Sequence, residues 1–226
     1  MKYFLPLLAL LLAACGDPKD PNGMPAKTTS RAPARLLAAH PPKPDSAAAK
    51  TENAVMPADT SLAGAWLLLD GALRGHDAKV LNLLMDPEYG LWLLEQTGAV
   101  PLVTRVADVQ RFRDQHQQPL FVLDKKLMPG TVPKVVARLP VARCPAGTFA
   151  PAGCFSGPAT AFRALNFWER AAIKGGNRNQ GQAAQGRTVG SVLQTTTGYQ
   201  FHFAKSAGAG GHWRLIFVDL RGPCPQ

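Results

Sequence analysis

The chain has 226 residues, a formal net charge of +10 at neutral pH and 46% hydrophobic residues. This length and composition predict one folded domain of ordinary size. No segment offers the roughly 20 uncharged apolar residues that a transmembrane helix needs, so we expect no membrane-spanning helix.

The N-terminus has the parts of an export signal. Lys2 supplies a positive charge, Leu5 to Leu12 form an apolar run, and Ala13 and Ala14 are the small residues that a signal peptidase requires. The tetrapeptide Leu12-Ala13-Ala14-Cys15 resembles the lipobox of bacterial lipoprotein signal peptides. This resemblance implies that residues 1–14 are a signal peptide and that Cys15 is the lipid attachment site. The alternative is an ordinary signal peptide followed by an incidental cysteine.

The resemblance also predicts a location. Lipoproteins of this kind carry two or three acyl chains, palmitate among them, on the cysteine, and more than one chain is needed for stable membrane attachment. We therefore expect the protein to be anchored in the cell envelope, facing the periplasm. Gly16 rather than Asp follows Cys15, which favours the outer membrane over the inner one. Nucleic acid is not an expected partner in this compartment.

The segment after the cysteine, within residues 15–58, has the composition of a disordered tether. It contains no Phe, Trp or Tyr, and it contains eight prolines: Pro18, Pro21, Pro25, Pro33, Pro41, Pro42, Pro44 and Pro57. Such a segment cannot bury enough apolar area to offset the entropy of ordering it. We expect it to hold the domain away from the membrane.

Residues 59–226 are expected to form a single domain that begins with two helices. Leu62, Trp66, Leu69 and Leu73 recur at helical spacing, with Asp59 or Thr60 as the cap and Gly75 as the end. Asp77 can cap a second helix, which Asp86-Pro87 stops. The pattern then predicts a buried strand over 89–95, a helix over 106–114 that brings Val109 and Phe112 together, and strands over 119–123 and 134–139.

The second half of the domain is expected to contain a helix, a loop and a meander. Residues 160–173 place Phe162, Leu165 and Trp168 on one helical face, and the Gly-rich and Asn-rich segment 174–187 is typical of a mobile loop. Three strands over 189–195, 199–205 and 213–220 predict an antiparallel meander with a tight Thr197-Gly198 turn. The predicted class is α+β, with N-terminal helices packed on a curved antiparallel sheet that ends in this three-stranded meander.

Two segments carry a resemblance to a known fold. The passage from Gly75-His76-Asp77 to Asp86-Pro87-Glu88-Tyr89-Gly90 is similar to the helix-to-strand passage of nuclear transport factor two-like domains. The run Gly211-His212-Trp213-Arg214-Leu215 is similar to their last strand. The resemblance implies a curved sheet that wraps a long helix and leaves a pocket, with residues 125–188 as an insertion. Because that fold includes both enzymes and binding proteins, it does not determine the function.

The charge is unevenly distributed along the domain. Residues 60–124 hold five Lys or Arg and eight Asp or Glu, whereas residues 125–226 hold thirteen Lys or Arg and two acids. A basic half can attract anionic lipid headgroups or acidic wall polymers. The alternative is an ordinary solvated basic surface, because the cations are scattered rather than clustered in a run.

Three cysteines follow Cys15. Cys144 and Cys154 bracket a short Pro-rich and Gly-rich segment, and an oxidising compartment favours a disulfide between them. Cys224 is the alternative partner for either one, and the sequence does not choose between these pairings. A zinc site needs more closely spaced ligands, so we expect no metal and no cofactor.

Three residues are candidates for a catalytic pocket: His76, His202 and Arg214. His76, next to Asp77, is a candidate base with an orienting carboxylate, although such a pair is more often a simple helix junction. His202 lies in the middle of a strand, with Arg214 expected on the neighbouring strand; a solvent-facing position on the outer face of the sheet is the alternative. The chain has no phosphate-binding Gly-rich loop, no Gly-x-Ser-x-Gly turn and no His-Glu-x-x-His motif.

Three functional hypotheses follow from the sequence. We favour a non-catalytic, membrane-anchored envelope lipoprotein whose tethered domain binds a partner protein, a wall component or a small ligand. The first alternative is an envelope enzyme with a cone-shaped pocket and histidine acid/base chemistry. The second alternative is an electrostatic binder of anionic envelope polymers.

Overall fold

A computed structural model of the chain describes residues 60–96, 98–206 and 211–224. The predicted signal peptide, Cys15 and the tether lie outside these residues. Within the described ranges, no helix is both long enough and apolar enough to cross a membrane.

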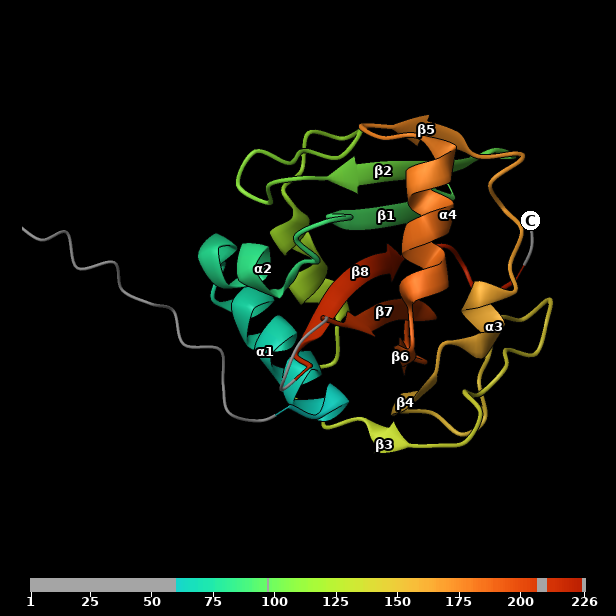
Figure 1. Cartoon of the computed structure of the whole chain (residues 1–226). Helices are drawn as coiled ribbons and strands as arrows, with labels where there is room; N and C mark the ends of the chain where they lie inside the picture. The colour runs from blue at the N-terminus through green and yellow to red at the C-terminus, as the bar shows by residue number, and fades with distance from the viewer. Residues whose placement is uncertain (1–59, 97, 207–210, 225–226) are drawn as a thin grey trace, which may run out of the picture. The chain divides into compact units, whose positions relative to one another are not determined.

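One mixed sheet organises the domain (Figure 1). Its eight described strands lie in the order β3-β4-β6-β7-β8-β1-β2-β5. Their bounds are β1 Leu91–Gln96, β2 Pro101–Val106, β3 Lys134–Val135, β4 Cys154–Pro158, β5 Ala172–Lys174, β6 Gly190–Gln194, β7 Tyr199–Lys205 and β8 Trp213–Asp219. The α+β class is confirmed, and the predicted C-terminal meander is β6-β7-β8.

The sheet is not antiparallel throughout. The pairs β1–β8, β2–β5 and β3–β4 are parallel, and the other pairs are antiparallel. One of these parallel pairs, β1–β8, joins the N-terminal β1–β2 hairpin to the meander. Trp92 lies opposite Phe217 and Leu94 lies opposite Asp219, so β1 and β8 run in the same direction and end at the same edge.

The first two helices and a 3-10 helix cover one face of the sheet. They are α1 (Leu62–Arg74), α2 (Ala78–Leu84) and η1 (Leu120–Lys126). Leu69 and Leu73 of α1 pack in one core with Leu93, Phe201 and Phe203 of the sheet. Both predicted helices are confirmed, and Asp77 caps α2 as expected. The N-cap of α1 is Ser61, whose Oγ accepts a 3.0 Å hydrogen bond from the Gly64 N–H, rather than Asp59 or Thr60.

The opposite face is covered by α3 (Thr160–Arg163), α4 (Arg178–Arg187) and the segment 164–171 between α3 and β5. Trp92 and Phe217 of the sheet pack here against Phe162 and Trp168. In Figure 1, α4 is drawn in orange in front of the sheet, and it contacts β8.

The prediction of a mobile loop over 174–187 was therefore wrong. Asn177 caps α4 by accepting a 3.0 Å hydrogen bond from the Gln180 N–H. Gly181 lets the helix approach the Trp168 ring so closely that a Cβ would lie 2.1 Å from it. Helix α4 thus depends on tertiary contacts, which hydrophobic periodicity does not reveal, because its buried residues are small or polar.

The predicted helix over 160–173 ends at Arg163. The Gln185 side chain donates hydrogen bonds of 2.7 Å and 3.0 Å to the carbonyls of Phe162 and Leu165. A longer helix would use these carbonyls for its own backbone bonds. The chain turns away instead and reaches the edge strand β5.

Three shorter predictions also differ from the structure. Residues 101–106 form β2, and Val109 and Phe112 are buried as expected but lie in turns rather than in a helix. The expected strand over 119–123 is η1, in which the i,i+3 pair Leu120 and Leu123 is buried. Only Lys134–Val135 of the expected strand over 134–139 pairs with the sheet, at its edge.

Candidate functional site

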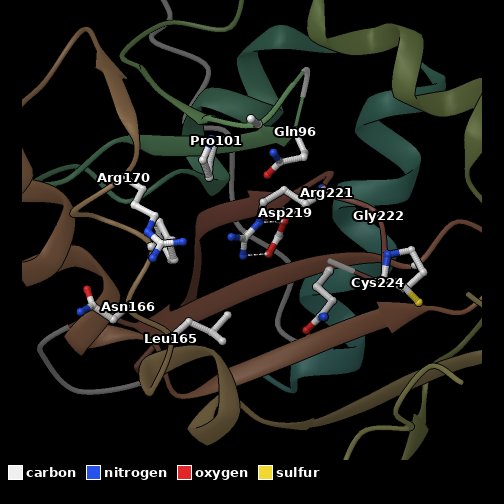
Figure 2. A pocket seen from close by; sticks show the side chains of 14 residues that line it. Gln96, Pro101, Leu165, Asn166, Arg170, Asp219, Arg221, Gly222 and Cys224 are labelled. Carbon is white, nitrogen blue, oxygen red and sulfur yellow. Dashed lines mark hydrogen bonds and ion pairs between the residues drawn. The ribbon is translucent and has the colours of Figure 1, made fainter. Parts of the chain in front are cut away.

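A cleft of about 540 Å³ lies at the edge of the sheet where the parallel neighbours β1 and β8 end (Figure 2). Gln96 closes β1, Asp219 closes β8, and Gln200 stands near the start of β7. The segment 164–171 supplies the facing wall with Asn166, Phe167 and Arg170. The carboxyl ends of adjacent parallel strands are a common location for ligand sites in open sheets.

An ion pair forms one side of the cleft. Arg221 binds Asp219 in a bidentate manner, with Nε 2.8 Å from Oδ1 and one terminal nitrogen 2.6 Å from Oδ2. The backbone N–H of Arg221 also donates a 3.1 Å bond to Oδ1. The guanidinium carbon lies 4.8 Å from the centre of the Phe167 ring, in a cation–π arrangement. These contacts hold the Arg221 fork in a fixed position.

Three other polar side chains of the cleft, Arg170, Asn166 and Gln200, are free to bind. Arg170 is exposed, and its guanidinium has no hydrogen-bond or ion-pair partner among the described residues. The side-chain amides of Asn166 and Gln200 likewise have no partner in that part of the chain. Figure 2 shows Arg170 and Arg221 reaching into the same cleft from different elements.

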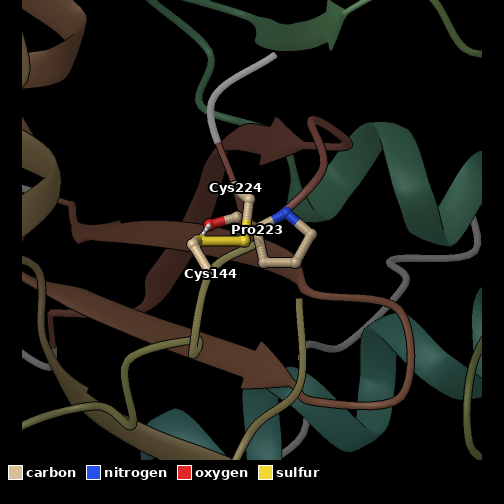
Figure 3. The surroundings of a disulfide bond; sticks show 3 residues. All are labelled: Cys144, Pro223 and Cys224. Carbon is tan, nitrogen blue, oxygen red and sulfur yellow. Dashed lines mark hydrogen bonds between the residues drawn. A yellow bond between two sulfur atoms is a disulfide. The ribbon is translucent and has the colours of Figure 1, made fainter. Parts of the chain in front are cut away.

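A disulfide fixes the rim of the cleft (Figure 3). It joins Cys144 to Cys224, which are 80 positions apart in the sequence. Pro223 next to it packs on Gly198, where a Cβ would lie 3.0 Å from the proline ring, and Gly198 has a φ of +76° that favours glycine. The segment 222–224 is thereby attached to the loop around Cys144.

The favoured pairing of Cys144 with Cys154 is therefore wrong, and the alternative partner Cys224 is confirmed. Cys154 lies on β4 with its side chain in the core below α1, and its thiol is free and buried. Burial, assisted by the negative charge of Asp70, raises the pKa of this thiol to about 12. The strand holds Cys154 in the core, so it does not reach the surface loop that carries Cys144.

His202 does not line the cleft. Its ring stacks on Phe162 with the centroids 3.6 Å apart, and its Nδ1 is 2.7 Å from the Ser191 hydroxyl oxygen. Its Nε2 is buried with no partner in the described chain. Burial, with a smaller contribution from the Arg221 charge, lowers the pKa of His202 to about 3. The residue faces neither a polar pocket nor solvent, because α3 covers it.

The other two pocket candidates lie elsewhere. His76 occupies the turn between α1 and α2, stacks on Phe121 of η1, and has its Nε2 3.6 Å from the Asp124 carboxylate. Arg214 of β8 donates a hydrogen bond to the Leu83 carbonyl of α2. His76 thus sits with the helices on the face opposite the one that covers His202. The structure does not bring the three candidates together.

The residues of the cleft were missed in the sequence because they are far apart along the chain. The only local signal is Asp219-Leu220-Arg221, an acid and a base two positions apart at the end of a strong strand pattern. Arg170 falls within the helix predicted over 160–173, so no pattern in the sequence indicated that it lines a cleft. Across the described ranges, no group of three His, Cys, Asp or Glu residues could hold a metal ion.

No family model, curated protein or solved structure matches this chain. The resemblances to lipoprotein signal peptides and to nuclear transport factor two-like domains therefore stay predictions.

Proposed function

We propose that this protein is a lipid-anchored envelope protein whose folded domain binds a small ligand or wall component in the cleft between β1, β8 and the segment 164–171. The observation that carries the proposal is the combination, in one cleft, of the free Arg170 guanidinium with the fixed Asp219–Arg221 pair. A free cation beside unpaired amides gives the cleft convergent polar groups that can orient a ligand.

The rigidity of the cleft supports a binding role. Asp219 is held by Arg221, and segment 222–224 is held by the disulfide. A preformed site loses less entropy when it takes up a ligand than a site that must order first. An acid/base enzyme built on His202, His76 and Arg214 has no such support, because none of the three lines the cleft.

The anchor is proposed from the sequence alone. Cleavage before Cys15 and its acylation would attach the domain to a membrane, with the tether as a spacer. In a host that processes lipoproteins, Cys15→Ser should move the chain from the membrane fraction to the soluble periplasmic fraction. A Cys15→Ser chain that remains membrane-bound would contradict the anchor, and Cys154→Ser is the control for loss of an unrelated thiol.

Native mass spectrometry of the full chain, purified from its own envelope in detergent, tests the cleft. Gly222 lines the cleft, and a Cβ built there meets no atom within 4 Å. In Gly222→Trp, the indole side chain should therefore fill the cleft without disturbing the fold. Gly186→Trp is the matched control, because Gly186 is equally unobstructed but lies on α4. We expect a noncovalent mass on the native chain and on Gly186→Trp that is absent from Gly222→Trp. If both variants retained this noncovalent mass equally, the proposal would be contradicted.

A second function is favoured by the distribution of charge between the two layers. Residues 159–189, which cover one face of the sheet, contain five cations and only one acid, Glu169. The cations are Arg163, Arg170, Lys174, Arg178 and Arg187. None of them forms an ion pair with a described carboxylate. Residues 61–86 and 120–126 on the other face hold four cations and four acids.

This basic layer supports electrostatic contact with anionic envelope polymers or lipids. The Cys15→Ser chain should cosediment with phosphatidylglycerol vesicles at about 0.05 M salt and be released at about 0.5 M salt, where screening is strong. Neutralising Arg163, Arg178 and Arg187 to Gln should weaken sedimentation. Neutralising Lys79, Lys125 and Lys126 on the other layer should not. Equal effects of the two triple variants would rule out a specific basic face.

A further inference from the structure

The charge of the cleft limits the charge of its ligand. Two guanidinium groups, Arg170 and Arg221, and one carboxylate, Asp219, line it. Asp219 and Arg221 neutralise one another in their bidentate pair, so the cleft presents one uncompensated positive charge, on Arg170. A monoanion balances that charge. A dianion such as hydrogen phosphate would bring a second negative charge for which the cleft has no free cation.

The hydrogen-bonding groups limit the ligand further. Both Asp219 oxygens already accept bonds from Arg221, so they are engaged within the protein. Arg170 offers a planar fork of donors that fits the two oxygens of a carboxylate. The amides of Asn166 and Gln200 each supply donors and an acceptor, as a peptide group does. The apolar surface of Leu165 completes this wall.

We propose that the cleft binds the free carboxyl end of a short peptide, with Arg170 on the carboxylate and with Asn166 and Gln200 on the adjoining peptide amides. This inference rests on the proposed function of the cleft. A free carboxyl end combines, within a few ångströms, one negative charge and amide groups that both donate and accept. An acidic sugar carries the same carboxylate with hydroxyl groups in place of amides, and the experiment separates the two sources.

The test is isothermal titration calorimetry of the full chain in detergent with three probes: N-acetyl-alanyl-alanine, its C-terminal amide, and glucuronate. The first two differ only in the charged group. We expect the free acid to bind at least about tenfold more tightly than the amide, since bonds to charged groups are the stronger ones. Equal binding of acid and amide, or no binding of the acid, would overturn the inference. Tighter binding of glucuronate than of the peptide acid would overturn the peptide assignment.

Two arginine variants test whether Arg170 contacts the carboxylate of the peptide. Arg170→Gln should weaken binding of the peptide acid at least about tenfold and leave the weak binding of the amide unchanged. Arg163→Gln is the matched control, because Arg163 is an exposed arginine of α3 that does not line the cleft. Equal affinities of the two variants for the acid would overturn the role of Arg170.

Failure of this inference can be distinguished from failure of the proposed function. The peptide acid could fail to bind while Gly222→Trp still abolishes the noncovalent mass seen on the native chain. The cleft would then be a binding site, and only the assigned ligand class would be wrong. If Gly222→Trp keeps that mass, the cleft itself is wrong.

Discussion

The indole Nε1 of Trp168 donates a buried 2.6 Å hydrogen bond to the side-chain carbonyl of Gln185. The same glutamine binds the carbonyls of Phe162 and Leu165 through its amide nitrogen. One side chain of α4 therefore orders the segment that presents Asn166, Phe167 and Arg170 to the cleft.

Removing the Gln185 side chain should destabilise the domain. Gln185→Ala leaves the Trp168 N–H without its partner and removes bonds to two carbonyls, of which that of Phe162 still accepts from the Leu165 N–H. Each buried unsatisfied group costs about 1–3 kcal/mol. We expect the free energy of unfolding to fall by about 3 kcal/mol in urea denaturation. Gln182→Ala, at an exposed position of the same helix, is the control and should change it by less than about 0.5 kcal/mol. A similar small change in both variants would show that the hydrogen bonds do not hold α4 in place.

Two glycines of α4 should respond in opposite directions to the same substitution. A Cβ at Gly181 would lie 2.1 Å from Trp168, whereas a Cβ at Gly186 meets no atom within 4 Å. Gly181→Ala should lower the free energy of unfolding by about 1–3 kcal/mol through overpacking. Gly186→Ala should raise it by about 0.4–1 kcal/mol, because alanine lowers the entropy of the unfolded chain. The comparison is made by thermal and urea unfolding, and stabilisation by Gly181→Ala would contradict the packing.

His202 should make the domain less stable in mild acid. Its pKa in the folded protein is about 3, below its ordinary value of 6.5. Between these two values the unfolded chain binds a proton that the folded chain does not. Stability is therefore unaffected by this group above pH 6.5 and falls as the pH drops towards 3, by up to about 1.4 kcal/mol per unit.

The slope of unfolding free energy against pH tests this effect. In His202→Asn the slope between pH 6 and about pH 4 should be smaller by roughly 1 kcal/mol per unit. His116→Asn is the control, since His116 is exposed in a turn. A slope in His202→Asn as steep as in the unmodified protein would show that the buried imidazole is not the source.

The disulfide pairing can be verified directly. A non-reducing peptide map should show Cys144 linked to Cys224, and Cys154 should react with alkylating reagents only after unfolding. Cys224→Ala removes a cross-link between two residues that are 80 positions apart, so the free energy of unfolding should fall by about 3–4 kcal/mol. The same loss in Cys144→Ala, and no further loss in the double variant, would assign the effect to the bond. A Cys144–Cys154 peptide would contradict the structure.

The strongly periodic parts of the sequence predicted the fold well. Strand β7 occupies 199–205 as expected, and the patterns around Leu69 and Leu93 identified α1 and β1. These elements bury continuous apolar faces, and that burial is encoded in local spacing. The α+β class followed from them, as did the terminal meander.

The cleft could not be predicted in the same way. Helix α4 has the sequence RNQGQAAQGR, with few apolar residues, and depends on a ring supplied by Trp168. Arg170 lies in an irregular segment whose course is set by Gln185, a later residue. The pairing of Cys144 with Cys224 depends on where β4 places Cys154. Each of these features results from contacts between distant segments, which single-sequence patterns do not contain.

The two edge strands of the described sheet are β3, with two residues, and β5, with three. Each carries an exposed lysine, Lys134 on β3 and Lys174 on β5. Short strands with a charge are poor templates for another strand, because pairing would add few backbone bonds and bring like charges together. Pairing of these sheets edge to edge between copies of the domain, and growth of such pairs into a filament, is therefore disfavoured.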